Sequence, residues 1–328
     1  MGSITNIEKV ENLLKIGTFL KMFRVNFNGL RIYIQEQPFQ YYSGLTGALS
    51  AATFKGDPDA KRLTGWRNSM IDSFGEKNTK DFVDMTADFG SLLHMSLVTI
   101  KEKGCIDWGE EKDRSYEYFI NAYKAKNIEP DMKTIKNMSY DYCKHVASLL
   151  QFIHERVHEI YAIETPCIWE TMKIATPIDL VCSCRPTEKG AFVNTTINIK
   201  TSSQISGHQL EQIACENFMW NATYDFQADN TAIVRTKDWN ESKSPTFEFK
   251  YLNKEDSDKI ALEAAKRLGI CLNSSASYFP SPISKSFQGT TKAGEKPEII
   301  SKTLEEEWTE TSKELNDLIE FNKLISNQ

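Results

Sequence analysis

Residues 175–200 read ATPIDLVCSCRPTEKGAFVNTTINIK and contain the strongest structural signal in the chain. Two runs of apolar, β-branched and small residues, 178–185 and 191–200, are separated by the polar residues 186–190. Short runs of this kind on either side of a turn with proline and glycine are typical of two antiparallel strands. The segment therefore predicts a β-hairpin.

Three polar side chains of this hairpin are expected to lie close together. Side chains two residues apart on a strand point the same way, so Asn198 and Lys200 share one face and Ile199 points into the core. Asp179 opens the preceding strand, where its carboxylate can meet residues 198 and 200 across the ladder. A carboxylate and an ammonium group are thus predicted side by side at one end of the hairpin.

Helices and further strands surround the hairpin in the sequence. Hydrophobic periodicity predicts long helices before it, the first of which ends at Gly104, and a helix, two strands and another helix after it. The expected helices cover residues 80–103, 132–160, 206–221 and 255–268, and the additional strands cover residues 161–164, 167–174, 231–236 and 246–252. Clustered strands between helices indicate the mixed α/β class, with a central mixed β-sheet flanked by helices.

The chain is expected to consist of three consecutive parts. Residues 1–130 are predicted to form a helical N-terminal part, in which residues 37–66 have the composition of turns and short helices. Residues 131–270 contain the core with the hairpin. Residues 271–328 are expected to form a loop rich in Ser, Pro and Gly, followed by a charged C-terminal helix.

Composition restricts the class of protein. With 328 residues, of which 40% are hydrophobic and 11% aromatic, the chain is expected to be globular. Its apolar runs are shorter than the roughly 20 residues of a membrane-spanning helix, and no secretory signal is apparent, so we expect a cytoplasmic protein without a membrane partner. The net charge of −6 disfavours a surface that binds nucleic acid throughout, but it allows a local basic groove.

The seven cysteines indicate neither a disulfide framework nor a metal cluster. They are odd in number and scattered, without a C-x-x-C pair, which is typical of reduced thiols. We therefore expect no zinc site on cysteines and no iron–sulfur cluster. Cys182 and Cys184, on the strand face opposite Asp179, are expected to be small core residues.

The polar residues of the hairpin suit the hydrolysis of phosphodiester bonds. That reaction needs a divalent metal, which stabilises charge on the scissile phosphate and lowers the pKa of the attacking water. Mg²⁺ prefers oxygen ligands and keeps several waters, so a few carboxylates are sufficient to bind it. A nearby ammonium group such as that of Lys200 can hold the water and offset charge in the transition state.

The hairpin and its surroundings resemble the PD-(D/E)XK nucleases. In the second and third motifs of that superfamily an Asp starts one strand and acid-x-Lys closes the next, as Asp179 and the segment ending at Lys200 do here. The segment SGHQLEQIACENFMW, residues 206–220, resembles the glutamine motif of the RecB-like branch, with Gln212 as the glutamine. Glu216 stands where that motif usually has an aromatic residue.

Upstream segments resemble further motifs of the same branch. TADFGSLLHMSL, residues 86–97, resembles its Gly-x-x-x-His motif, and YAIETPCIWETMKIATPID, residues 161–179, resembles the strand that bears an additional glutamate. YYSGLTGALS, residues 41–50, and KRLTGWRNSM, residues 61–70, resemble the opening motifs of phage-type exonucleases. The motifs follow the order of the family from about Tyr41 to Leu252.

The resemblance implies a restriction-endonuclease-like core and a metal-dependent DNA exonuclease that acts in recombination, repair or replication on linear or single-stranded DNA ends. It implies Mg²⁺ or Mn²⁺ as the cofactor and a ligand set made of His94, Glu164, Asp179 and Asn198. Lys200 would orient the attacking water, and Gln212 would position Lys200 or the DNA backbone. The cytoplasm, that of the host if the source is viral, is the implied location.

Asn198 departs from the family pattern, because an acid is expected there. An amide oxygen carries no net charge, so the affinity for a hard divalent cation should fall. Two explanations are open: Asn198 is an inactivating substitution in a nuclease, or the natural protein is a catalytically inactive DNA-binding or assembly protein that keeps the fold. Cleavage by a variant with an acid at position 198 would separate them.

The segment HERVH, residues 154–158, gives a third hypothesis. It matches the His-Glu-x-x-His pattern of zinc peptidases, in which two histidines one helical turn apart bind zinc. Here His154, Glu155 and His158 would be the site residues. No clear third ligand follows in the sequence, so this hypothesis ranks below the nuclease.

Overall fold

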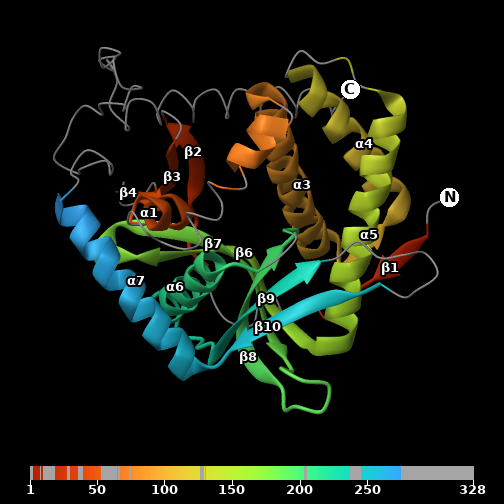
Figure 1. The fold of residues 1–328 in the computed structure, drawn as a ribbon. Helices are drawn as coiled ribbons and strands as arrows, with labels where there is room; N and C mark the ends of the chain where they lie inside the picture. The colour runs from red at the N-terminus through yellow and green to blue at the C-terminus, as the bar shows by residue number, and fades with distance from the viewer. Residues whose placement is uncertain are drawn as a thin grey trace, which may run out of the picture. The chain divides into compact units, whose positions relative to one another are not determined.

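A computed structural model of the chain describes residues 3–7, 9, 19–27, 30–35, 40–52, 65, 67–73, 75–125, 129, 131–202, 205–236 and 245–274. The fold is mixed α/β, with a mixed β-sheet flanked by helices, which confirms the expected fold class (Figure 1). The chain divides into two compact units. The first consists of Met1–Leu20, Thr53–Trp169 and Thr176–Ala265, and the second consists of Lys21–Ala52, Glu170–Ala175 and Lys266–Gln328.

The first unit is built on the predicted hairpin. Its sheet has the order β10-β9-β8-β7, and β6 also pairs with β7. β7 and β8 are antiparallel, β8 and β9 are parallel, and β9 and β10 are antiparallel. These strands are β6 (Val157–Trp169), β7 (Ile174–Cys184), β8 (Val193–Lys200), β9 (Asn230–Thr236) and β10 (Phe247–Leu252).

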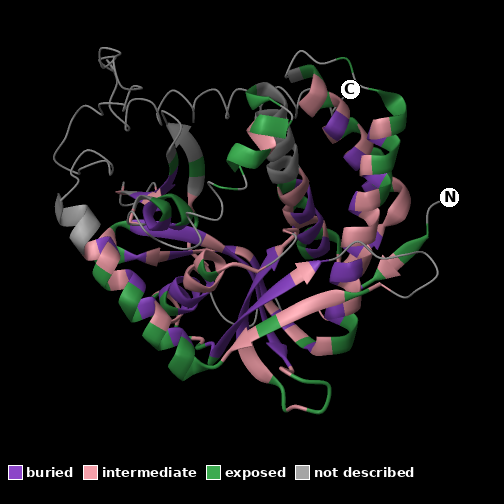
Figure 2. Cartoon of the chain, in the orientation of Figure 1, coloured by how far each residue is buried: buried purple, intermediate pink, exposed green. Residues whose placement is uncertain are grey.

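One face of this sheet packs into the main hydrophobic core. The register pairs Leu180 with Ile197 and Ile197 with Ala232, so these side chains share a face. They are buried together with apolar residues of α3 (Glu76–Lys103), α4 (Trp108–Ala125) and α5 (Met132–Arg156). Cys182 and Cys184 belong to the same buried cluster, as predicted, and Figure 2 shows the buried residues concentrated in the central strands.

The opposite face of the sheet is covered by α6 (Gly207–Thr223). Thr196 of β8 donates to Asn217 Oδ1 of α6 at 3.1 Å, and Thr231 of β9 donates to the carbonyl of Ile213 at 3.2 Å. Asn198 and Lys200 alternate with Ile197 and therefore lie on this second face. The structure thus places the polar end of the hairpin under α6.

Local capping residues determine where these helices begin or end. α3 ends at Lys103 because Gly104 takes a left-handed conformation with φ 63°, which glycine adopts without steric cost. α5 begins after Asp131, whose carboxylate accepts from the backbone amides of Lys133 and Thr134. α6 begins with a capping box between Ser206 and Gln209.

The first unit also contains β1 (Ile4–Asn6), which pairs with β5 (Cys105–Asp107).

The second unit contains an antiparallel meander. β2 (Phe23–Phe27), β3 (Leu30–Gln35) and β4 (Gln40–Gly44) pair in sequence, and α1 (Leu45–Ala51) follows. β4 is parallel to the first residues of β7, with Ser43 opposite Ile174. The N-terminal part is therefore not wholly helical, and the prediction of turns and short helices from residue 37 was wrong for β4. Segments such as LRIYIQ alternate apolar and polar residues, which is the strand pattern.

Other boundaries also differ from the predictions. The two short strands expected at residues 161–174 are one strand, β6, followed by the 3₁₀ turn Glu170–Met172. The helix predicted at residues 255–268 is α7 (Lys254–Ser274), which extends six residues further at its C-terminal end. The loop and helix expected beyond residue 274, and half of the segment 61–70, lie outside the described residues. None of the described helices is long and apolar enough to cross a membrane.

Candidate metal centre

The candidate site starts where the main-chain ladder between β7 and β8 ends. The paired residues run from Cys184 and Val193 to Leu180 and Ile197. One residue before this last pair, Asp179 Oδ2 accepts a hydrogen bond from the backbone amide of Ile199 at 2.7 Å. The carboxylate takes the place of a strand carbonyl. It is thereby held at the open end of the hairpin, with the residue only 4% exposed.

His94 of α3 and Glu164 of β6 complete a compact group with Asp179. His94 Nδ1 lies 2.7 Å from Glu164 Oε1 and 3.5 Å from Asp179 Oδ1. One potential ligand atom from each of the three residues lies within 4.8 Å of the others. The sequence motifs therefore indicated three residues that the fold brings together from distant parts of the chain.

Glu164 reaches this position through an unusual backbone conformation. Its φ is 45°, in the left-handed region that residues with a Cβ rarely occupy. Along β6 the buried positions are even-numbered at Ile160 and Ala162 and odd-numbered from Ile163 onward. Glu164 follows directly after this change of phase, and its side chain contacts His94. Lys101 Nζ donates to the carbonyl of Ile163 at 2.8 Å and ties this part of β6 to α3.

The electrostatics of the group favour a cation. The negative charge of Asp179, followed by the hydrogen bond to Glu164, raises the pKa of His94 to about 9. Burial raises the pKa of Glu164, and the contact with His94 opposes that shift. The protonated imidazole thus supplies a positive charge between two carboxylates, and it must lose a proton before it can bind a metal ion. Carboxylate oxygens in this arrangement are the ligands that a hard divalent cation such as Mg²⁺ or Mn²⁺ prefers, so the residues fit such an ion.

Lys200 and Gln212 lie beside this group. Lys200 is half-buried on β8, and its Nζ donates to Gln212 Oε1 of α6 at 3.4 Å. The positive charge of Lys200 acts on His94, whose pKa it lowers. The structure thus places Gln212 against the lysine that it was predicted to position.

Asn198 is oriented towards α6, where the sequence had not indicated a partner. Its Nδ2 donates to both carboxylate oxygens of Glu216, at 3.2 and 3.0 Å. Glu216 Oε1 also accepts from Gln212 Nε2 at 2.7 Å. Sequence reasoning missed Glu216 as a site residue, although its place four residues after Gln212, where the family has an aromatic residue, was a usable signal.

Glu216 is a buried carboxylate with a shifted pKa. Burial, and next the charge of Asp179, raise the pKa of Glu216 to about 8, while Lys200 and the two amide donors oppose the shift. Asn198 Oδ1 is buried and has no hydrogen-bond partner within the described part of the chain. The second face of the hairpin therefore contains one acid on the helix and one unsatisfied amide oxygen on the strand.

The structure removes the geometric basis of the zinc-peptidase hypothesis. α5 ends at Arg156, so His154 is on the helix and His158 is on β6. The spacing of one helical turn that the pattern requires is therefore absent. His154, Glu155 and His158 are exposed.

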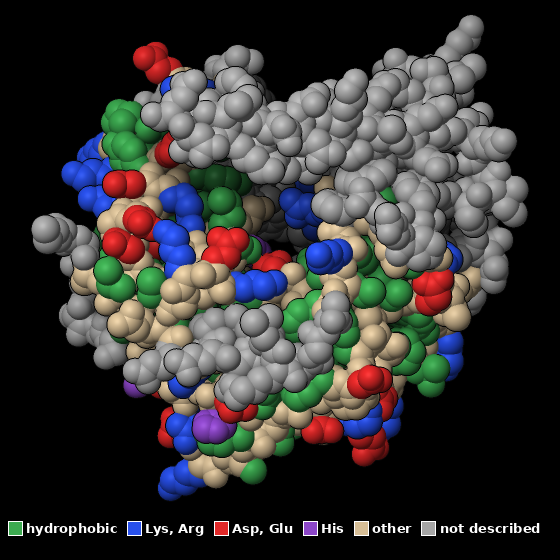
Figure 3. Space-filling model, turned by 180° about the vertical axis from the view of Figure 1, so that it is seen from behind, with side chains coloured by type: hydrophobic (Ala, Val, Ile, Leu, Met, Phe, Trp, Pro, Cys, Tyr) green, Lys and Arg blue, Asp and Glu red, His purple; other side chains and the backbone are tan. Residues whose placement is uncertain are grey.

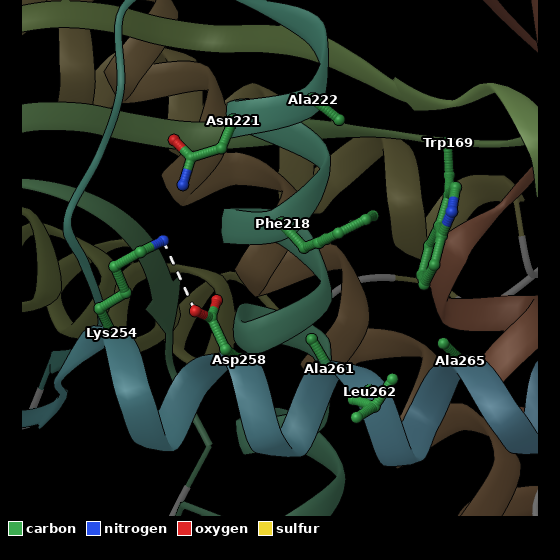
Figure 4. A pocket seen from close by; sticks show the side chains of 9 residues that line it. All are labelled: Trp169, Phe218, Asn221, Ala222, Lys254, Asp258, Ala261, Leu262 and Ala265. Atoms are coloured by element: carbon green, nitrogen blue, oxygen red, sulfur yellow. Dashed lines mark ion pairs between the residues drawn. The ribbon is translucent and has the colours of Figure 1, made fainter.

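Outside this site, the described residues form an apolar pocket and a surface of mixed charge. The pocket in Figure 4 lies between α6 and α7, with Trp169, Phe218 and Leu262 among its mainly apolar lining. Phe218 is about 200° around the helix axis from Glu216, so the pocket is on the other side of α6. On the face seen in Figure 3, basic and acidic side chains are interspersed, and the described residues there form no broad surface of one sign.

The sequence matches no protein-family model and no curated protein.

Proposed function

We propose that this chain is a metal-dependent nuclease of the PD-(D/E)XK type that hydrolyses phosphodiester bonds in DNA. The observation that carries the proposal is the convergence of His94, Glu164 and Asp179 within 4.8 Å at the open end of a hairpin whose second strand presents Lys200. Two carboxylates, a histidine and a lysine in this arrangement combine ligands for a hard cation with a positive charge for the phosphate.

The residues have distinct roles in the proposed reaction. Glu164, Asp179 and His94 would hold the divalent ion, with Asn198 Oδ1 as a further oxygen. When bound, such an ion stabilises charge on the phosphate and lowers the pKa of a bound water. Lys200 orients the attacking water and offsets negative charge on the phosphate oxygens. Gln212 accepts a hydrogen bond from the Lys200 amine and keeps it on this side of the sheet.

Asn198 favours a second candidate, a DNA-binding or assembly protein without cleavage. A neutral residue at this position lowers the negative charge available to a cation on the strand. A protein of this kind would use Lys200 and the fold to contact DNA, and it would bind DNA without cleaving it.

End-labelled linear DNA, double- and single-stranded, tests the proposal. The full chain is incubated with Mg²⁺ or Mn²⁺, with or without EDTA, and the products are resolved on denaturing gels. We expect metal-dependent release of nucleotides that falls by about 100-fold or more in Lys200→Ala, the loss typical of a group that stabilises transition-state charge. Lys250→Ala, which changes an exposed strand lysine on β10, is the matched control and should retain activity.

The outcomes separate the candidates. Cleavage that persists in both Lys200→Ala and Asp179→Asn comes from a contaminant or another site and overturns the proposal. A gel shift of DNA by the chain, without cleavage in either metal, supports the binding protein instead.

A further inference from the structure

Glu216 is a buried acid that α6 directs at the hairpin. It is 2% exposed, and its two oxygens face the amide of Asn198 while Oε1 also accepts from Gln212. A buried carboxylate is costly unless hydrogen bonds or opposite charges compensate it. Here neutral amides from the strand and from the preceding turn of the helix provide those hydrogen bonds.

The amide at position 198 makes this arrangement possible. Its Nδ2 lies 3.0 and 3.2 Å from the two oxygens of Glu216, so an aspartate there would place a second carboxylate at about the same separation. Two carboxylates that close cannot both ionise without a cation between them. Asn198 and Glu216 are therefore complementary: an acid on the helix is accompanied by an amide on the strand.

The other atom of the Asn198 amide also indicates a ligand. Because Nδ2 is bound to Glu216, Oδ1 is directed away from it, and this buried oxygen has no hydrogen-bond partner among the described residues. An unsatisfied buried acceptor costs about 1–3 kcal/mol. Amide oxygens are ordinary ligands of hard divalent cations, so a bound ion would satisfy this atom.

We propose that Glu216, which a bound divalent cation would keep ionised, supplies the negative charge that position 198 lacks, and that it acts as a positioning residue which orients Asn198 Oδ1 towards that cation. The inference rests on the nuclease function proposed above. Under it Asn198 is the matched partner of Glu216, not an inactivating substitution. The acid of the site is on α6, and the strand provides a neutral oxygen.

Mn²⁺ binding to the purified full chain tests this inference. Free Mn²⁺ is measured by electron paramagnetic resonance for the native chain, Glu216→Gln, Asn198→Asp and the double variant Asn198→Asp with Glu216→Gln. We expect Glu216→Gln to weaken Mn²⁺ binding by about tenfold or more, as is typical for residues that orient metal ligands. The double variant exchanges the acid and the amide, and we expect it to regain an affinity within about threefold of the native chain, because the total charge and the hydrogen bond are restored.

Two comparisons exclude a purely structural effect. Glu111→Gln changes another buried glutamate, which is 1% exposed and hydrogen-bonded to Tyr142 in α5, so it should lower thermal stability and leave Mn²⁺ affinity unchanged. Asn198→Asp alone should lower the thermal stability of the ion-free chain, because it places two acids together. The double variant should recover that stability.

The results distinguish this inference from the proposed function. Equal Mn²⁺ affinity in the native chain and Glu216→Gln overturns the inference but not the proposed function. The same holds if the double variant binds Mn²⁺ as weakly as Glu216→Gln does. A large gain in Mn²⁺ affinity and DNA cleavage from Asn198→Asp alone overturns it in favour of an inactivated nuclease. Mn²⁺ binding that depends on Glu216, without cleavage of any DNA, supports the ion site and overturns the nuclease. No Mn²⁺ binding by the native chain overturns both.

Discussion

The backbone at Glu164 combines strain with a candidate function. A left-handed conformation costs roughly 1–2 kcal/mol for a residue with a Cβ, and such residues concentrate at functional sites. Glu164 has this conformation inside β6, and its carboxylate meets His94 at 2.7 Å. A relaxed strand would continue the even-numbered phase of Ala162 and would turn the residue at 164 towards the core.

Substitutions at Glu164 test this strain directly. Glu164→Gly and Glu164→Ala both lose the contact with His94, so their difference isolates the backbone. We expect the glycine variant to be more stable than the alanine variant by about 1 kcal/mol, because glycine adopts a positive φ without steric cost. Urea denaturation in EDTA measures the free energies of unfolding. At Glu159, a position of β6 without positive φ, the alanine variant should instead be more stable than the glycine variant. If the alanine variant is the more stable at both positions, the backbone at Glu164 is not strained.

The individual site residues could be predicted to different degrees. His94, Glu164, Asp179, Lys200 and Gln212 lie in motifs whose order resembles a family, and the structure brings them into one neighbourhood. The contact between Asn198 and Glu216 could not be derived from spacing. It depends on the angle at which α6 crosses the second face of the sheet, and a short sequence pattern does not encode that angle.

Among the elements, the periodic ones were the easiest to predict. The hairpin of β7 and β8, α3 with its end at Gly104, and α6 follow from local patterns and caps. The meander of β2 to β4 was missed because glycines and polar residues interrupt its short alternating runs. The junction of α5 and β6 was placed too late, since Ile153, Val157 and Ile160 keep the spacing of a helix across it.

The N-terminus of α6 offers a prediction at this scale. In its capping box the Ser206 hydroxyl accepts from the Gln209 amide, and the Gln209 side chain accepts from the Ser206 amide. We expect Ser206→Ala to lower the free energy of unfolding by about 1 kcal/mol, because it leaves a helix amide unsatisfied. Ser206→Thr keeps a hydroxyl and should lose little. Equal losses in the two variants, measured by urea denaturation, would show that the cap contributes nothing.

The stability of the whole molecule should depend on pH and on divalent ions together. The folded state raises the pKa of His94 from 6.5 to about 9. A raised pKa contributes stability that is complete below pH 6.5 and is lost as the pH rises through 9. The raised pKa of Glu216, about 8, acts in the same direction. In EDTA we therefore expect the free energy of unfolding to fall across this range.

Mn²⁺ should oppose that fall, because a bound cation replaces the proton between the carboxylates. An ion concentration of 100 times the dissociation constant would add about 2.7 kcal/mol. Thermal denaturation at pH 6.5 and 9, with EDTA or Mn²⁺, measures both effects. His94→Gln should flatten the dependence in EDTA. If the stability of His94→Gln fell more steeply with pH than that of the native chain, these residues would not form a cation-binding group. The same would follow if Mn²⁺ stabilised Asp179→Asn as much as the native chain.

The hydrogen bond from Ile199 to Asp179 has a consequence for ion size. Oδ2 of this carboxylate accepts from the backbone amide of Ile199, which leaves Oδ1 as the less engaged oxygen, 3.5 Å from His94 Nδ1. An ion at the proposed site would meet a carboxylate whose direction is preset. Large ions such as Ca²⁺ take six to eight oxygens and often use both atoms of a carboxylate, whereas small ions are satisfied by one. In the proposed site, the end of the β-ladder would therefore favour a small ion such as Mg²⁺ over Ca²⁺.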